Sequence, residues 1–113
     1  MKGFMRTIVP GLIIAFSVLY ALAANPPSGK PSGPAIKNGQ RIFIQSCASC
    51  HDAHTDKVKS GPGLKGYYTA RRPRPADAHV REIIEQGKGT MPGFAASIAG
   101  SQADDLIAYL KTL

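Results

Sequence analysis

The chain has 113 residues, of which 43% are hydrophobic, and its 14 basic and 7 acidic residues give a net charge of +7. This length fits one domain and excludes a catalytic domain joined to a separate regulatory one. Chains this small bury little apolar surface, so we expect something other than side chains to complete the core.

The first 23 residues have the pattern of an export signal. Lys2 and Arg6 give a positive start, residues 12–20 form a short apolar stretch, and Ala21-Leu22-Ala23 supplies the small residues at which signal peptidases cut. Cleavage there would leave a small domain of about 90 residues with a net charge of +5. The pattern predicts that residues 1–23 are a signal peptide and that the mature domain is periplasmic.

An uncleaved membrane anchor is the alternative for this end of the chain. Residues 8–24 have about the minimum length, roughly 17 residues, of a helix that spans a bilayer. Residues 24–35 are rich in proline, glycine and serine, which is typical of a linker. This segment would be a free tail after cleavage, or a tether that holds the domain at the periplasmic face of the inner membrane. Residues 36–113 form the domain.

The first helix is expected to run from Ala35 into the pair of cysteines, because Ile36, Phe43 and Cys47 fall on one face. Residues 52–74 are polar and rich in glycine and proline, and we expect an irregular loop. A loop this long is unusual in a compact domain unless it is functional or wraps around something.

Two more helices are expected in the second half of the chain. One begins near Asp77 and ends at Gly87, a residue type that commonly ends helices. The other begins at Ser101, where a capping-box pattern occurs. Their apolar faces consist of Val80, Ile83 and Ile84 and of Leu106, Ile107, Tyr109, Leu110 and Leu113. No alternating strand pattern occurs, so the predicted fold class is all-α.

The residues that carry chemistry form a C-x-x-C-H motif at Cys47, Cys50 and His51. This motif is typical of covalent haem attachment. Two thiols three residues apart on a helical turn can each reach one vinyl group of the same porphyrin, and the histidine then supplies a nitrogen to the iron. The motif predicts one haem c, bound through thioethers to both cysteines and ligated by His51.

Three other uses of the two cysteines fit the sequence less well. A thioredoxin-like redox pair needs a βαβ context, which the sequence lacks. A structural zinc site needs four ligands, and only His51, His54 and His79 are available to join the two thiols, at unsuitable spacings. A disulfide between Cys47 and Cys50 would close a very small loop and stabilise the domain little.

The order of these features resembles that of the class I c-type cytochromes, which are small electron carriers of three to five helices wrapped around one covalently attached haem. The family has a glycine-and-aromatic helix, the C-x-x-C-H motif, a G-P-x-L-x-G loop, a methionine loop and an aromatic C-terminal helix. The matching residues of this chain are Gly39 and Phe43, Cys47 to His51, Gly61 to Gly66, Met91-Pro92 and Tyr109-Leu110.

Met91 is the expected second axial ligand of the iron. Met1 and Met5 belong to the signal segment, which leaves Met91 as the one thioether of the mature domain. It lies in a glycine- and proline-containing loop between two helices, whereas a methionine that fills a gap in the core would more often lie on a helix face. His54 and His79 are the rival ligands. Two filled axial positions leave no place for a substrate, which predicts that the protein is not an enzyme.

The resemblance implies further contacts. The carbonyl group of Pro62 would accept a hydrogen bond from His51, Leu64 would pack on the porphyrin, and Gly39 would let the first and last helices cross closely. Many family members place an arginine near the haem propionates, four residues after the second loop glycine. Here that position is Ala70, so the propionate partner is open, with Arg71, Arg72, Tyr67 and Tyr68 as candidates.

The excess of basic over acidic residues favours redox partners with acidic docking surfaces, because lysines and arginines flank the expected haem loops. The alternative is an ordinary solvated surface. No nucleic-acid-binding module is recognisable. The predicted function is single-electron transfer between periplasmic or membrane redox proteins. The alternatives are a cytochrome subunit of a dehydrogenase or oxidase complex, and a haem enzyme or gas sensor with an open axial site.

Overall fold

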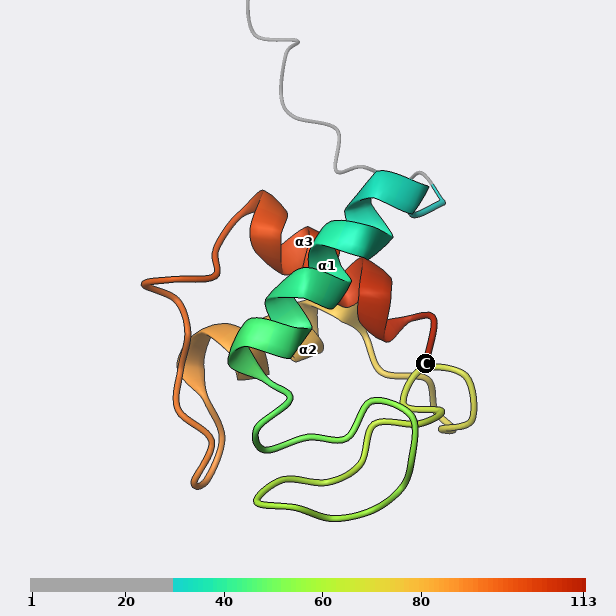
Figure 1. Cartoon of the computed structure of the whole chain (residues 1–113), viewed down its shortest axis with the longest axis vertical. Coiled ribbons are helices and arrows are strands. Elements are labelled where there is room, and N and C mark those ends of the chain that lie inside the picture. Colours follow the sequence, from blue (N-terminus) through green and yellow to red (C-terminus); the bar gives the residue numbers. More distant parts are fainter. Residues whose placement is uncertain (1–29) are drawn as a thin grey trace, which may run out of the picture.

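A computed structural model describes residues 30–113. Three helices account for the regular structure of this part of the chain: α1 (Gly33–Ser46), α2 (Asp77–Gln86) and α3 (Ser101–Leu110) (Figure 1). The expectation of an all-α domain is confirmed. The expected signal or anchor and most of the linker lie outside the described residues, and within residues 30–113 every helix is too short or too polar to span a bilayer.

Helix α1 begins at Gly33, two residues earlier than the apolar pattern indicates. The Ser32 hydroxyl accepts a hydrogen bond from the backbone N–H of Ala35, at 3.4 Å, and so caps the first turn. Pro34 fits in this turn because the backbone N–H groups at the start of a helix have no partner within the helix, so a proline there loses no hydrogen bond. Residues 33–35, which composition assigns to the linker, are therefore helical.

Helices α1 and α3 cross in close contact at Gly39 (Figure 1). A Cβ atom added at Gly39 would lie 1.9 Å from the carbonyl oxygen of Asp105 and 2.8 Å from Cβ of Tyr109. Beside this point the rings of Phe43 and Tyr109 pack with their centroids 5.6 Å apart. The Asn38 side-chain amide also donates a hydrogen bond of 2.6 Å to the Asp105 carboxylate. The close crossing that the resemblance implied is confirmed.

The buried core lies at this crossing and continues to α2. It contains Ile42, Phe43, Tyr68, Val80, Ile84, Ile98, Ala103, Leu106, Ile107, Tyr109 and Leu110. Several apolar side chains next to it, among them Leu64, Tyr67 and Phe94, are only partly buried. The irregular loop that was expected between the cysteine motif and α2 is present (Figure 1).

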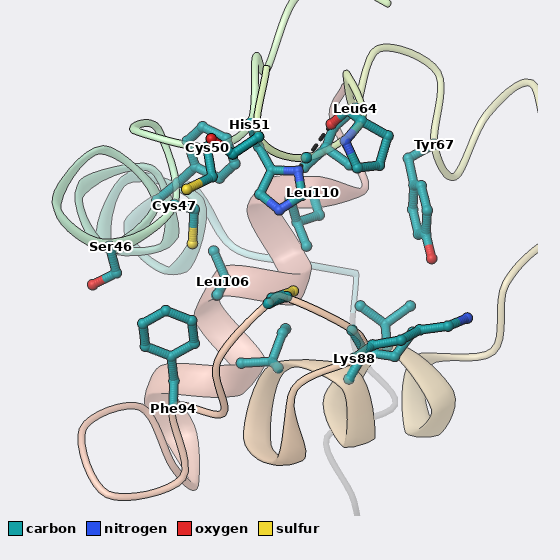
Figure 2. Close-up of a pocket in the computed structure, with 18 of the residues that line it drawn as sticks. Ser46, Cys47, Cys50, His51, Leu64, Tyr67, Lys88, Phe94, Leu106 and Leu110 are labelled. Atoms are coloured by element: carbon teal, nitrogen blue, oxygen red, sulfur yellow. Dashed lines mark hydrogen bonds between the residues drawn. The ribbon is translucent and has the colours of Figure 1, made fainter. Parts of the chain in front are cut away.

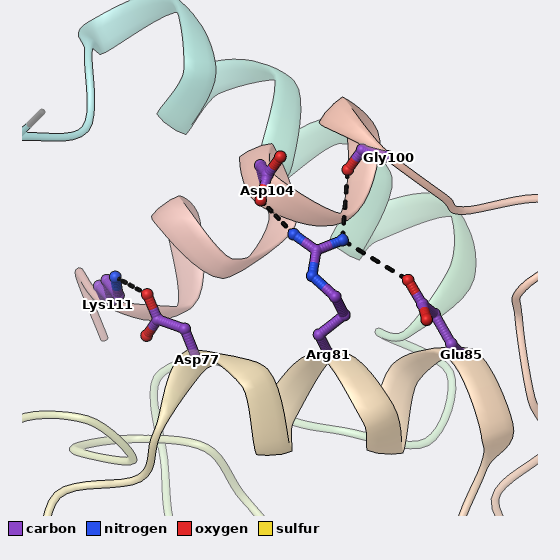
Figure 3. Close-up of polar contacts among 6 residues, drawn as sticks. All are labelled: Asp77, Arg81, Glu85, Gly100, Asp104 and Lys111. Carbon is purple, nitrogen blue, oxygen red and sulfur yellow. Dashed lines mark hydrogen bonds and ion pairs between the residues drawn. The ribbon is translucent and has the colours of Figure 1, made fainter. Parts of the chain in front are cut away.

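Polar contacts fasten α2 to the C-terminal helix (Figure 3). The half-buried Arg81 pairs with Glu85 on its own helix and with Asp104 on α3. At the other end of α2, Asp77 pairs with Lys111, which follows α3. Because the chain leaves α2 directly into the loop that holds the candidate methionine, these contacts also fix where that loop begins.

We expect Gly39→Ala to lower the free energy of unfolding by about 1–3 kcal/mol, the usual cost of overpacking. The methyl group would meet the backbone of Asp105, which cannot turn aside as a side chain can. Gly33→Ala is the matched control on the same helix, because a Cβ atom there meets nothing within 4 Å. Chemical denaturation of both variants measures the difference, and equal stability of the two would contradict the close crossing.

Candidate functional site

A cavity of about 540 Å³ lies between the cysteine motif, the irregular loop, the C-terminal part of α2 and the methionine loop (Figure 2). Its walls include every site residue that the sequence indicated: Cys47, Cys50, His51, Pro62, Leu64, Arg71 and Met91. The helices contribute six apolar side chains to the remaining lining: Phe43, Val80, Ile83, Ile84, Leu106 and Leu110. One chamber therefore collects residues that are spread over most of the described chain.

The cysteine motif turns the chain away from α1 into the cavity wall. The helix ends at Ser46, and the N–H of Cys47 still donates to the carbonyl group of Phe43, at 2.8 Å. The N–H groups of Cys50 and His51 then donate to the carbonyl group of Cys47, at 3.1 and 2.9 Å. The two sulfurs are free thiols and not a disulfide. Burial, and secondarily the nearby Cys50, raises the pKa of the Cys47 thiol to about 11.

The imidazole ring of His51 is held in one orientation. Its Nδ1 lies 2.9 Å from the carbonyl oxygen of Pro62, and because a carbonyl only accepts, Nδ1 carries the proton. Nε2 is then left as the unprotonated nitrogen. A Cβ atom at Gly61 would lie 2.4 Å from Cε1 of this ring, so only glycine leaves room for it. The contact implied by the resemblance is present.

The loop that carries Pro62 is tied to the motif by local hydrogen bonds. The Asp52 carboxylate accepts from the N–H groups of His54 and Thr55, both at 2.9 Å. These bonds, that from His54 above all, lower the pKa of Asp52. The carbonyl group of Asp52 accepts from the N–H of Leu64, at 2.8 Å, which brings the Leu64 side chain to the cavity. The exposed His54 is outside the cavity lining.

Met91 is presented by a tight turn that follows α2. Its N–H donates to the carbonyl group of Lys88 at 3.0 Å, and the N–H of Lys88 donates back to the carbonyl group of Met91 at 3.1 Å. Gly87 precedes this pair with φ of +79°, and a Cβ atom there would lie 2.4 Å from the Met91 carbonyl oxygen. The rival ligand His79 is exposed on α2, near Glu82, and does not line the cavity.

One end of the cavity is polar and charged. Arg71 lies over the ring of Tyr67, with 4.5 Å between the guanidinium carbon and the ring centroid, and both residues line the cavity. The other two propionate candidates face elsewhere. The guanidinium of Arg72 donates to backbone carbonyl groups of its own loop, and Tyr68 is buried in the core. Arg71 and Tyr67 are thus the two candidates that lie at the cavity.

Two residues that the sequence did not indicate as site residues, Lys88 and Phe94, also line the cavity. The stripe on α2 was recognised as an apolar face, but periodicity does not tell whether such a face meets protein or a cofactor. Lys88 pairs with Met91 across a two-residue turn, Gly89-Thr90. A single glycine in a loop is compatible with such a turn but does not by itself predict it.

The side chains present fit a covalently attached haem. The volume is within the usual range of a small-molecule site, roughly 300–1,000 Å³. Two free thiols, an imidazole with an unprotonated Nε2 and a thioether are the groups that attach and ligate a haem c. Within residues 30–113 no three side chains of the His, Cys, Asp or Glu type gather as a candidate site for a single metal ion.

Comparison with known proteins agrees with this chemistry. Residues 34–110 match the family described as cytochrome C oxidase, cbb3-type, subunit III. The chain is 31% identical to cytochrome c6 of Nostoc sp., over 70% of this chain and 75% of that protein. It is 29% identical to cytochrome c6 of Synechocystis sp., over 66% of this chain and 62% of that protein.

A third relative is the cbb3-type cytochrome c oxidase subunit FixPc of Rhizobium leguminosarum bv. viciae. It is 27% identical over 74% of this chain, which corresponds to 30% of that protein. The family match covers more than half of the chain, and the cavity holds the residues that a haem c requires. The chain therefore belongs to the cytochrome c family and is a class I monohaem c-type cytochrome with one covalently bound haem c.

Proposed function

We propose that this protein carries single electrons between redox proteins of the periplasm or the membrane. The observation that carries the proposal is one cavity lined by two free thiols, the imidazole of His51 and the thioether of Met91. When bound, the haem supplies an iron atom that changes between the ferric and ferrous states by one electron. The similarity to the cytochromes c6 supports this role.

Cys47 and Cys50 hold the haem in this proposal. Each thiol would add across one vinyl group, with the sulfur bonded to one vinyl carbon and the hydrogen transferred to the other, so that no oxidant or reductant would be consumed. The apolar wall, which includes Leu64, packs against the porphyrin and keeps water away from the iron. Arg71, held over the Tyr67 ring, pairs with haem carboxylates at the polar end.

His51 and Met91 would hold the iron. The hydrogen bond from Nδ1 of His51 to Pro62 fixes the ring and would make Nε2 a stronger base toward the iron. A methionine sulfur as the second ligand would raise the reduction potential. With both positions filled, a small substrate has no free position on the iron, and this favours an electron carrier over an enzyme or gas sensor.

Charge supports docking onto acidic partners. Between residues 47 and 76 the chain carries six basic residues, Lys57, Lys59, Lys65, Arg71, Arg72 and Arg74, against the two acidic residues Asp52 and Asp56. The acidic side chains of α2 and α3 are largely paired within the molecule. The loops around the cavity therefore present an excess of positive charge, which would steer an acidic partner toward the haem.

The proposed location is the periplasm, where covalent haem attachment of this kind takes place. Residues 1–23 would be the signal peptide, or residues 8–24 an uncleaved anchor in the inner membrane. Residues 24–35 would then be the tail or tether, with residues 36–113 as the cytochrome domain.

A second candidate is a cytochrome subunit bound permanently to an oxidase or dehydrogenase. The family description and the FixPc match favour it, since both name a cbb3-type oxidase. Gentle purification distinguishes the two. A carrier would elute at the size of one small domain, whereas a subunit would co-purify in fixed ratio with the polypeptides of a larger complex.

We expect a haem stain on a denaturing gel to colour the wild-type band and not that of Cys47→Ala/Cys50→Ala, because thioethers survive denaturation. Ser49→Ala, a substitution between the two cysteines, is the matched control and should keep the full colour. A colourless wild-type band from cells that attach haem to other proteins would refute covalent binding.

Met91→Ala should abolish the ferric absorption band that reports a methionine sulfur on iron. It should also allow carbon monoxide to bind the ferrous protein, whereas the wild type should not bind it readily. His54→Ala and His79→Ala are the controls, since both side chains lie outside the cavity lining. If the band is absent from the wild type, or disappears in a histidine variant, Met91 is not the ligand.

Electron transfer to an acidic redox protein should slow severalfold as ionic strength rises to about 0.15 M, where the screening length falls to about 8 Å. The paired substitutions Lys57→Gln and Lys59→Gln should reduce the rate at low salt more than Lys37→Gln and Arg41→Gln on α1. Stopped-flow kinetics measures both effects. A rate that is independent of salt would argue against the charged docking surface.

A further inference from the structure

The polar end of the cavity contains a second cation that the proposed function does not use. Lys88 lines the cavity together with Tyr67 and Arg71. In Figure 2 the tips of Tyr67 and Lys88 lie on the side of the cavity away from Cys47 and Ser46. The cavity thus has a thiol end and a cationic end.

The backbone fixes the place of Lys88 relative to Met91. The two residues exchange both of their backbone hydrogen bonds, at 3.0 and 3.1 Å, as an antiparallel bridge across a two-residue turn. Directly opposed residues of such a pair project their side chains to the same face. Both side chains accordingly line the one cavity.

The turn itself is tied to α2. The N–H of Phe94 donates to the carbonyl group of Ile84, at 2.9 Å, and the N–H of Ala95 donates to that of Glu85, at 3.2 Å. A Cβ atom at Gly93 would lie 2.5 Å from the same Glu85 oxygen, so the returning chain runs directly against the helix end. Lys88 is therefore placed by backbone contacts on both sides and does not rest on a free loop.

The chemistry of the haem supplies the orientation. Its two vinyl groups lie on one side of the porphyrin and its two propionates on the opposite side. Thioethers at Cys47 and Cys50 therefore direct the carboxylates to the far end of the cavity, where the cations are. We propose that Lys88 is a second carboxylate anchor beside Arg71, and that it sets part of the reduction potential. This inference rests on the proposed haem binding.

The sign of the effect follows from charge. An ammonium group near the propionates offsets their negative charge, and uncompensated negative charge stabilises the more positive ferric iron. Loss of the cation should therefore lower the reduction potential. Lys88 is exposed, so water weakens the interaction, and we expect a shift of up to tenfold in the ferrous–ferric equilibrium, which is 59 mV for one electron.

The test compares Lys88→Gln with Lys65→Gln. Lys65 is also an exposed loop lysine, so the two variants change the net charge equally. Because Lys65 does not line the cavity, the comparison isolates the effect of a charge at the cavity. Lys88→Arg retains a cation at the same place. Spectroelectrochemical titration of the haem-loaded proteins gives the potentials, and the ferric methionine band is recorded for each.

We expect Lys88→Gln to lower the reduction potential by several times as much as Lys65→Gln does, and to retain the methionine band. The reduction potential of Lys88→Arg should be close to that of the wild type. Equal shifts in the two glutamine variants would assign Lys88 to the general surface and overturn the proposal. Loss of the methionine band in Lys88→Gln would also overturn the proposal, because the substitution would then have changed the potential by moving Met91 through the turn. Absence of attached haem in the wild type would instead refute the proposed function itself.

Discussion

The hydrogen bond between His51 Nδ1 and the Pro62 carbonyl group joins the two parts of the chain that form the site. It fixes the proton on Nδ1, so that Nε2 is free to bind iron, and it holds the loop after the motif close to the ring. Gly61 permits this closeness, since any side chain there would overlap the imidazole. One contact thus sets the tautomer, the ring orientation and the position of the wall that carries Leu64.

The side chains of the three helices do not fill the interior of the domain. Residues on α2 and α3 that would be expected to meet protein, such as Ile83 and Leu106, also line the cavity. The cavity is therefore the part of the interior that a small chain cannot fill with its own side chains. This explains how a domain with so few large apolar residues can rely on three short helices.

Much of the fold and site could be predicted because the signals were local. The helices follow from apolar spacing, and the C-x-x-C-H motif needs five consecutive residues. The start of α1 was missed because a single hydroxyl, that of Ser32, decides it. Which arginine faces the cavity could not be predicted, since Arg71 and Arg72 are neighbours whose directions depend on Tyr67 and on loop carbonyl groups. The position of Lys88 depends likewise on a turn whose register is set by tertiary contacts.

The crossing of α1 and α3 also bears on how the chain folds. The Asn38–Asp105 hydrogen bond joins residues 67 positions apart, so the meeting of the first and last helices closes a loop that contains most of the domain. Closing so long a loop has an entropic cost that grows with the logarithm of its length, and contacts of this kind slow folding relative to local ones. A haem attached at Cys47 and Cys50 would join two residues only three apart, so it would leave almost all of that loop still to be closed. Attachment of the haem would accordingly stabilise the folded state by filling the cavity, and not by shortening the loop.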